Sequence, residues 1–340
     1  MTGEFVPNLE LNARFYTEVV APIVAPWCHS AARIGWGSEI LGFDTERSTD
    51  HGWGLRLNIF VATDDTALAR TAVNEQLPES FAGWPVRYGW DEYPVTHHVE
   101  VTTLAEWSTD FVGCDATKPL STVDWLLAPQ QRLLGVTRGA VYHDGLDALT
   151  PMREQLAWYP DDVARWMLAC QWHRVAQEEA FTGRTAEVND EIGSRLVAAR
   201  LVRELMCVHF LLAHEYWPYT KWFGSAYRAL PHAGELIPQF QAAIAATNYP
   251  DREAALVQCF EGVARLHDDL DIDPTVRNFY ARPFRVLDAD RFATAYREQI
   301  TDPWVRHLPL IGSIDQFVDS TDVLSYPETA QRLRAIYDAS

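Results

Sequence analysis

The sequence predicts an α+β protein, with a small α/β layer near the N-terminus followed by a helical domain. Helical and extended hydrophobic patterns alternate in the first third of the chain, whereas from Pro160 onward the patterns are helical. The chain has 340 residues, 48% of them apolar, which is enough to bury a core in each part. We therefore expect an α/β domain at residues 1–118, a connecting segment at 119–159 and a helical domain at 160–340.

The α/β layer is expected to begin with an amphipathic helix, because Leu11, Phe15 and Val19 share one helical face. A second helix is expected to follow the capping cluster Thr63-Asp64-Asp65 and to end at Gln76, before a proline. Alternating apolar and polar residues predict strands around these helices. The predicted strands are residues 32–35, 50–61 and 95–102.

The helical domain is expected to begin at Pro160, because proline followed by two aspartates favours the first turn of a helix. Further prolines separate the helical patterns that follow. These patterns cover residues 163–181, 191–214, 219–230, 252–270 and 327–337.

The acidic net charge of the chain limits the kinds of molecule that it is expected to bind. A formal net charge of −19, with no run of five basic residues, disfavours nucleic acid and favours a small-molecule or a protein acceptor. The five scattered cysteines predict reduced thiols and no zinc knuckle. The most apolar helical stretch is too short for a membrane span, and the N-terminus resembles no signal peptide. We therefore expect a cytoplasmic protein that does not enter a membrane.

Polar residues gather on one face of two predicted strands. Between residues 50 and 61 the odd positions are mostly apolar, so Asp50, position 52 and Arg56 fall on the other face. On the strand at 95–102, His98 and Glu100 share the face opposite the valines. We therefore expect Glu100 to lie across from Asp50. The plainer interpretations are a turn residue for Asp50, a solvated strand residue for Glu100 and a surface histidine for His98.

These residues match the needs of phosphoryl chemistry. Paired carboxylates such as Asp50 and Glu100 can hold Mg²⁺ or Mn²⁺, and the metal neutralises charge on a triphosphate. The Gly37-Ser38 turn offers backbone N–H groups and a hydroxyl to phosphate oxygens. In-line transfer then requires no protein nucleophile.

Gly37-Ser38, followed by a spacer and Asp50-His51-Gly52, resembles the signature of the polymerase-beta-type nucleotidyltransferase superfamily. The chain resembles, more specifically, an uncharacterised bacterial family of nucleotidyltransferase-like proteins. Several ordered segments carry this second resemblance: Asp44 with Ser48-Thr49-Asp50-His51-Gly52-Trp53-Gly54, Phe181-Thr182-Gly183-Arg184, Asp190-Glu191-Ile192-Gly193-Ser194, Tyr216-Trp217-Pro218-Tyr219-Thr220-Lys221-Trp222, Arg282-Pro283-Phe284 and Gly312-Ser313-Ile314-Asp315-Gln316.

The resemblance implies a mixed sheet with antiparallel edges and a helical C-terminal domain, similar in outline to aminoglycoside nucleotidyltransferases. It implies that Gly37 and Ser38 contact the triphosphate of ATP or another nucleoside triphosphate, and that Asp50 and Glu100 are metal ligands and catalytic residues. The sequence departs from the pattern at Gly52, where the second acid of the pair is expected. Three interpretations follow. Another acid takes the place of the missing one, a single metal ion is sufficient for transfer, or the protein binds a nucleotide without catalysing transfer.

Two basic residues complete the predicted site. Arg56 lies on the polar face of its strand, where it contacts either the nucleotide or a neighbouring acid. Lys221 either reaches the triphosphate from the helical domain or covers aromatic surface. We expect transfer of AMP from ATP to a hydroxyl of a small molecule or protein. The alternative is a catalytically impaired nucleotide-binding or regulatory protein.

One acidic segment is not a calcium loop. Residues 269–273 alternate Asp with apolar residues, as the start of an EF-hand loop does. Pro274 stands where that loop needs glycine, and Tyr280 stands where it needs glutamate. We expect a solvated acidic turn.

Overall fold

The computed structural model describes residues 5–50, 52–91, 93–267 and 269–338, without the side chains of Asp50 and Asp338. The chain forms two compact units. The first consists of residues 1–124, 128–157 and 325–332, and the second of residues 125–127, 158–324 and 333–340. The division therefore runs through the segment 119–159, and a short stretch near the C-terminus returns to the first unit.

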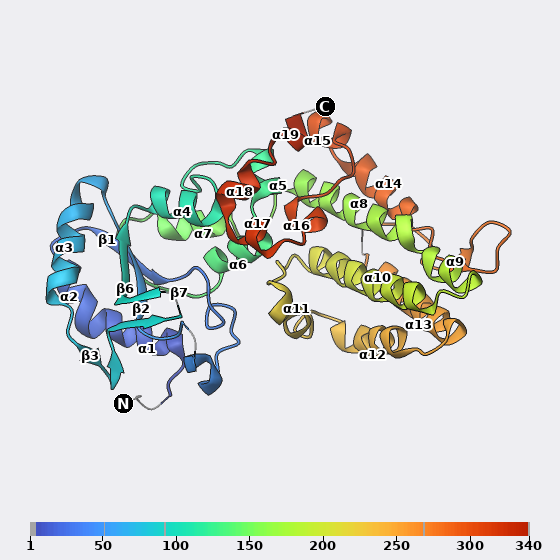
Figure 1. The fold of residues 1–340 in the computed structure, drawn as a ribbon. Helices are drawn as coiled ribbons and strands as arrows, with labels where there is room; N and C mark the ends of the chain where they lie inside the picture. Colours follow the sequence, from blue (N-terminus) through green and yellow to red (C-terminus); the bar gives the residue numbers. More distant parts are fainter. Residues whose placement is uncertain (1–4, 51, 92, 268, 339–340) are drawn as a thin grey trace. The chain divides into compact units, whose positions relative to one another are not determined.

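A five-stranded mixed sheet forms the centre of the first unit, in the order β5-β6-β2-β1-β7 (Figure 1). β2 and β6 are parallel, and every other neighbouring pair is antiparallel. Together with the helices that make up the second unit, this sheet confirms the predicted α+β class. The strands are β1 (His29–Arg33), β2 (Arg56–Val61), β5 (Arg87–Trp90), β6 (Tyr93–Thr102) and β7 (Ala140–Asp144).

Helices pack on both faces of this sheet. On one face, Leu11, Phe15 and Val73 from two helices join the inward side chains of β2 and β6 in one core. On the other face, the Trp107 ring of α4 packs against Phe60 of β2, with 5.6 Å between ring centroids. The smaller elements of the first unit are α1 (Asn8–Phe15), the π-helical turn Tyr16–Val20, α2 (Ala21–Val24), the 3-10 turns Glu46–Asp50 and Thr63–Asp65, α3 (Thr66–Gln76), β3 (Ser80–Phe81), β4 (Trp84–Pro85), α4 (Leu104–Val112), α6 (Gln130–Thr137), α7 (Leu149–Gln155) and α18 (Pro327–Gln331), with α5 (Thr122–Leu127) crossing into the second unit.

Helices build the second unit. The long helix α8 packs against α14 and α10, and Trp172 of α8 stacks on Phe292 of α14 with 4.7 Å between centroids. Buried Glu204 of α10 accepts hydrogen bonds from Arg174 of α8, so a satisfied ion pair joins the two helices. The elements are α8 (Asp161–Glu178), α9 (Phe181–Glu187), α10 (Glu191–Leu212), α11 (Thr220–Tyr227), α12 (Ala233–Ala245), α13 (Tyr249–Ala264), β8 (Arg277–Asn278), β9 (Arg285–Val286), α14 (Asp290–Gln299), α15 (Pro303–His307), α16 (Ile314–Phe317), α17 (Thr321–Ser325) and α19 (Ala335–Asp338).

The prediction of one strand over residues 50–61 is wrong in its first half. Residues 46–50 form a 3-10 turn, and the strand begins only at Arg56. The reason is the backbone at two glycines: Gly52 has φ +63° and Gly54 has φ +148°, values that an extended strand does not use. The predicted strand at 32–35 is likewise shifted, because β1 ends at Arg33 and a glycine with positive φ follows at position 35.

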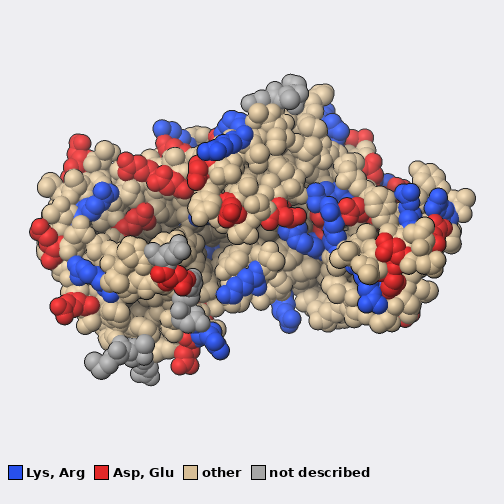
Figure 2. Space-filling model, viewed as in Figure 1, with Lys and Arg blue, Asp and Glu red and all other residues tan. Residues whose placement is uncertain are grey.

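Acidic and basic side chains are interspersed on the face of the molecule drawn in Figure 2. The acidic excess of the sequence is therefore not gathered there into one patch of a single sign. None of the helices in the described part of the chain combines the length and the apolar character that a bilayer span requires.

Candidate functional site

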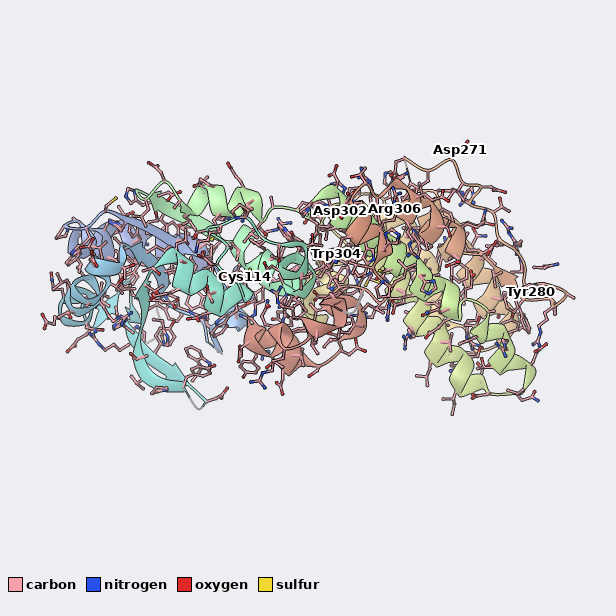
Figure 3. All side chains as sticks on the ribbon, turned by 90° about the horizontal axis from the view of Figure 1, so that it is seen from above. Cys114, Asp271, Tyr280, Asp302, Trp304 and Arg306 are labelled. Atoms are coloured by element: carbon pink, nitrogen blue, oxygen red, sulfur yellow. The ribbon has the colours of Figure 1, made fainter. Side chains whose placement is uncertain are left out.

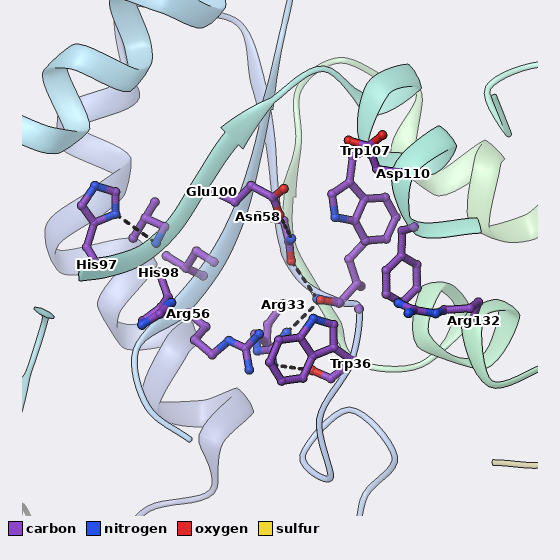
Figure 4. Close-up of a pocket in the computed structure, with 15 residues that line it drawn as sticks. Arg33, Trp36, Arg56, Asn58, His97, His98, Glu100, Trp107, Asp110 and Arg132 are labelled. Atoms are coloured by element: carbon purple, nitrogen blue, oxygen red, sulfur yellow. Dashed lines mark hydrogen bonds between the residues drawn. The ribbon is translucent and has the colours of Figure 1, made fainter. Parts of the chain in front are cut away.

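A cavity of about 450 Å³ opens on the face of the sheet that carries α4. Its walls come from the end of β1 and the turn after it, from β2 and β6, and from α4 and α6 (Figure 4). All of these elements belong to the first unit. Polar side chains line it: three arginines, two histidines, one asparagine and two carboxylates lie among indole and phenyl rings.

The parallel pair β2 and β6 brings the central polar groups together. The register sets Arg56 opposite His98 and Asn58 opposite Glu100. Asn58 Nδ2 donates a hydrogen bond to Glu100 Oε2 at 3.0 Å, and Asn58 Oδ1 accepts one from the Ile34 backbone N–H at 3.2 Å. The predicted shared face of Arg56 and Glu100 is therefore present. Glu100 lies opposite Asn58, however, and the prediction that its strand neighbour is Asp50 is wrong, because position 50 precedes the strand.

Glu100 is solvent-accessible inside the cavity, but the surrounding walls displace part of its water. This desolvation raises the pKa of the Glu100 carboxyl above its usual value, and the negative charge of Asp110 adds to the rise. The hydrogen bond from Asn58 and the charges of Arg56 and Arg33 act in the opposite direction. Glu100 is therefore a carboxyl whose affinity for a proton is increased, as a general base requires.

The Gly37-Ser38 turn is built around a buried ion pair. The Arg33 guanidinium pairs with the Glu39 carboxylate, and each side chain is 3% exposed. Gly37 has φ +141°, and a Cβ there would collide with the Glu39 carboxylate, so only glycine fits. Ser38 Oγ donates to Ser48 Oγ at 3.4 Å. The cavity wall itself is formed by the residues before this turn, including Trp36.

Arg56 is held by aromatic rings. Its guanidinium carbon lies 4.0 Å from the centroid of the Trp36 ring and 5.8 Å from that of Trp90, and its Nη1 donates to the Gly52 carbonyl at 3.1 Å. Burial lowers the pKa of Arg56 to about 10, and the charge of Arg33 contributes to the fall. The side chain therefore remains a cation at neutral pH.

The predicted metal ligands are only partly described. The backbone of Asp50 ends the 3-10 turn, and its side chain lies outside the described residues. At position 52, a Cβ would meet the Trp90 ring at 3.4 Å. The described residues contain no group of three or more His, Cys, Asp or Glu side chains that could hold a metal ion.

Lys221 belongs to the second unit and lies in the first turn of α11. Its side chain is exposed, and its Nζ lies 5.0 Å from the centroid of the Trp222 ring. This is the arrangement expected of a lysine that covers aromatic surface. Lys221 is not among the residues that line the cavity.

Several lining residues carried no clear sequence signal. Arg33 closes a buried strand and looks like an ordinary strand end, and Asp110 is one of many acids on exposed helical faces. Arg132 of α6 lies 4.6 Å from the Phe111 ring centroid and donates a hydrogen bond to the Ser325 carbonyl. Residues so far apart in sequence meet only in the folded unit. The pairing of Asn58 with Glu100, in contrast, could have been found by aligning the two strands in parallel.

The acidic segment after α13 is a surface turn, as predicted. Asp271 and Asp273 are exposed and line a second, open cavity of about 540 Å³ in the second unit. Figure 3 shows Asp271 and Tyr280 along the loop that joins α13 to α14. Asp273 Oδ1 accepts a hydrogen bond from the Thr275 backbone N–H at 2.9 Å, which closes a local turn.

Comparison with known proteins finds one family model that is similar to part of the chain. Residues 125–223, less than a third of the chain, match a family described as "Domain of unknown function (DUF4037)". No curated protein and no solved structure matches the chain. The matched segment contains one lining residue of the cavity, Arg132, whereas the remaining lining residues precede it. It also contains Lys221, which does not line the cavity.

Proposed function

We propose that the protein binds a nucleoside triphosphate in the cavity beside β2 and β6 and transfers its nucleoside monophosphate, AMP from ATP, to a hydroxyl of a small molecule or protein. One observation carries the proposal: the parallel register sets Arg56, Asn58 and Glu100 side by side in a cavity next to the Gly37-Ser38 turn. Cations for phosphate and a carboxyl for proton transfer are thus combined in one concave site.

The chemistry requires one bond to form and one to break. The acceptor oxygen bonds to the α-phosphorus, the bond from that phosphorus to the bridging oxygen breaks, and pyrophosphate leaves. In this proposal Glu100 takes the hydroxyl proton, which fits the raised pKa of its carboxyl. Arg56 and Arg33 attract the phosphates, and Gly37 and Ser38 contact them from the turn. The triphosphate contact predicted from the sequence for Lys221 stays a prediction.

The carboxylates of the cavity are suited to one Mg²⁺ or Mn²⁺ ion. Mg²⁺ is bound through one or two protein carboxylates together with substrate phosphates and water. Glu100 and Asp110 line the cavity and would hold it, with Asp50 as the further predicted ligand. When bound, the ion would neutralise charge on the leaving pyrophosphate.

Position 52 favours a second candidate function, a nucleotide-binding or regulatory protein without efficient transfer. The position lacks the second acid of the motif, and Gly52 has a positive φ with Trp90 against the place of its Cβ. A carboxylate there would have to be accommodated beside that ring. This candidate predicts stabilisation by nucleotide without release of pyrophosphate.

One experiment distinguishes the two candidate functions. The protein is incubated with labelled nucleoside triphosphates, Mg²⁺ or Mn²⁺ and candidate acceptors, and labelled product and pyrophosphate are measured. Asp50→Ala is the test variant, and Asp64→Ala, which removes an exposed carboxylate of the 3-10 turn after β2, is the matched control. Transfer should disappear in Asp50→Ala and persist in Asp64→Ala. Equal transfer by both variants would end the assignment of Asp50.

Charge and thiol chemistry support the remaining proposals. The acidic net charge supports a small-molecule or protein acceptor over nucleic acid. The five cysteines are present as thiols in the described part of the chain, which supports a reducing compartment such as the cytoplasm.

A further inference from the structure

The Arg56 guanidinium is bound at Gly52, the position where the nucleotidyltransferase-like motif lacks its second acid. Its Nη1 donates to the carbonyl of Gly52, and its plane is held against Trp36 and near Trp90. A carboxylate at position 52 would serve to hold a cation near the phosphates. This chain instead places a permanent cation at that position, bound through the glycine backbone.

Arg56 forms no direct ion pair among the described residues, although the more distant charges of Glu39 and Glu100 stabilise its cation. Among the described residues no carboxylate lies within ion-pair distance of Arg56, whereas Arg33 is paired with Glu39. The two guanidiniums repel each other, which is one cause of the lowered pKa of Arg56. In addition, the buried Nε of Arg33 has no hydrogen-bond partner among the described residues. An anion in the cavity would relieve the repulsion.

We infer that the cavity binds the polyphosphate of a nucleoside triphosphate through Arg56 and Arg33 without requiring a divalent cation, the Arg56 guanidinium supplying the charge that a second metal ion would otherwise provide. The inference rests on the proposed function, because it concerns the same cavity and the same ligand. A guanidinium donates paired hydrogen bonds to phosphate oxygens and keeps its charge when dehydrated, so it can replace a metal ion in binding.

The test is calorimetric binding of ATP and of inorganic tripolyphosphate, each measured with EDTA and with Mg²⁺. For the natural protein we expect ATP affinities that agree within about threefold between the two conditions. Arg56→Met should weaken binding in EDTA by about tenfold or more, the usual effect of losing a charge-assisted hydrogen bond. Arg14→Met is the matched control, since Arg14 is exposed on α1 and pairs with Glu18 at 3.4 Å. It should bind as the natural protein does.

Two further variants keep the test decisive if Arg56→Met does not fold. Arg56→Lys keeps the charge but loses the planar fork, so binding in EDTA should fall by a smaller factor than in Arg56→Met. Gly52→Asp places a carboxylate beside Arg56, which should neutralise it. Binding to Gly52→Asp should therefore weaken about tenfold in EDTA and recover with Mg²⁺.

The outcomes separate the inference from the proposed function. Binding of ATP by the natural protein only when Mg²⁺ is present would overturn the inference and leave the function standing. Binding of tripolyphosphate but not ATP would support the arginine site and overturn the nucleotide function. Absence of binding for both ligands in both conditions would overturn the two together.

Discussion

Asn58 joins two parallel strands and the end of a third. Its amide nitrogen donates to Glu100 on β6 at 3.0 Å, and its amide oxygen accepts from the backbone N–H of Ile34, directly after β1, at 3.2 Å. The residue is only 8% exposed. One side chain thus positions the carboxyl of the candidate site relative to the turn that precedes Gly37.

Replacing Asn58 should therefore destabilise the first unit. Asn58→Ala leaves the Ile34 N–H without its acceptor and Glu100 without its donor, so we expect a loss of about 1–3 kcal/mol in the free energy of unfolding. Asn58→Asp keeps the acceptor but sets two carboxylates together, and adding Glu100→Gln should recover stability. Urea unfolding of the single and double variants measures both effects. If the double variant Asn58→Asp with Glu100→Gln loses the sum of what the two single variants lose, the side chains at positions 58 and 100 do not interact.

The buried pair of Arg33 and Glu39 should be costly to break. Glu39→Gln leaves an unpaired guanidinium in a site that is 3% exposed, and we expect a loss of about 3–5 kcal/mol. The double variant Arg33→Met with Glu39→Met removes both charges and should lose less than the sum of the single variants Arg33→Met and Glu39→Met. Thermal and urea unfolding give the comparison. If the losses simply add, the two charges do not depend on each other.

Asp144 should stabilise the first unit only above acidic pH. Burial acts to raise its pKa, but hydrogen bonds from Ser30 Oγ at 2.6 Å and the Thr150 N–H at 2.7 Å outweigh it and hold the pKa at about 2. Since this lies below the ordinary value near 3.8, the contribution is complete above about pH 4 and disappears as pH falls toward 2.

The corresponding variant is Asp144→Asn. We expect it to lose about 1–2 kcal/mol of stability at pH 7, a range that allows for the partial exposure of the side chain, and almost nothing near pH 2. Urea unfolding of both proteins across this pH range gives the difference. A loss that is the same at both ends would show that the charge of Asp144 contributes nothing.

Glu100 should determine the acidic limb of the pH profile if it takes the acceptor proton. Because the pKa of its carboxyl is raised, transfer should increase with pH through a midpoint above the ordinary glutamate value. Glu100→Gln should lower the rate by about 10²–10⁴-fold and abolish that limb. Rates at saturating ATP, measured against pH, give the profile. An unchanged limb in Glu100→Gln would assign the proton to another group.

The alternation along β2 and β6 was predictable, as were the ends of these strands at Val61 and Thr102, whereas their first residues were not. Leu57 and Ile59 are apolar at alternate positions, so their burial in the core follows from the sequence. The early start predicted for that strand failed at Gly52 and Gly54, whose positive φ values break the extended chain. Periodicity reports which face a residue occupies but does not report backbone dihedrals at glycine.

The sequence by itself determined the α+β class, the faces of the strands and most of the helices, because these depend on patterns between near neighbours. Only the tertiary structure decided that Glu100 lies opposite Asn58, that Arg56 stacks on Trp36 and that Arg132 donates to the carbonyl of Ser325. Such contacts join residues far apart in the chain. They depend on strand register and on packing, and local pattern carries no information about either.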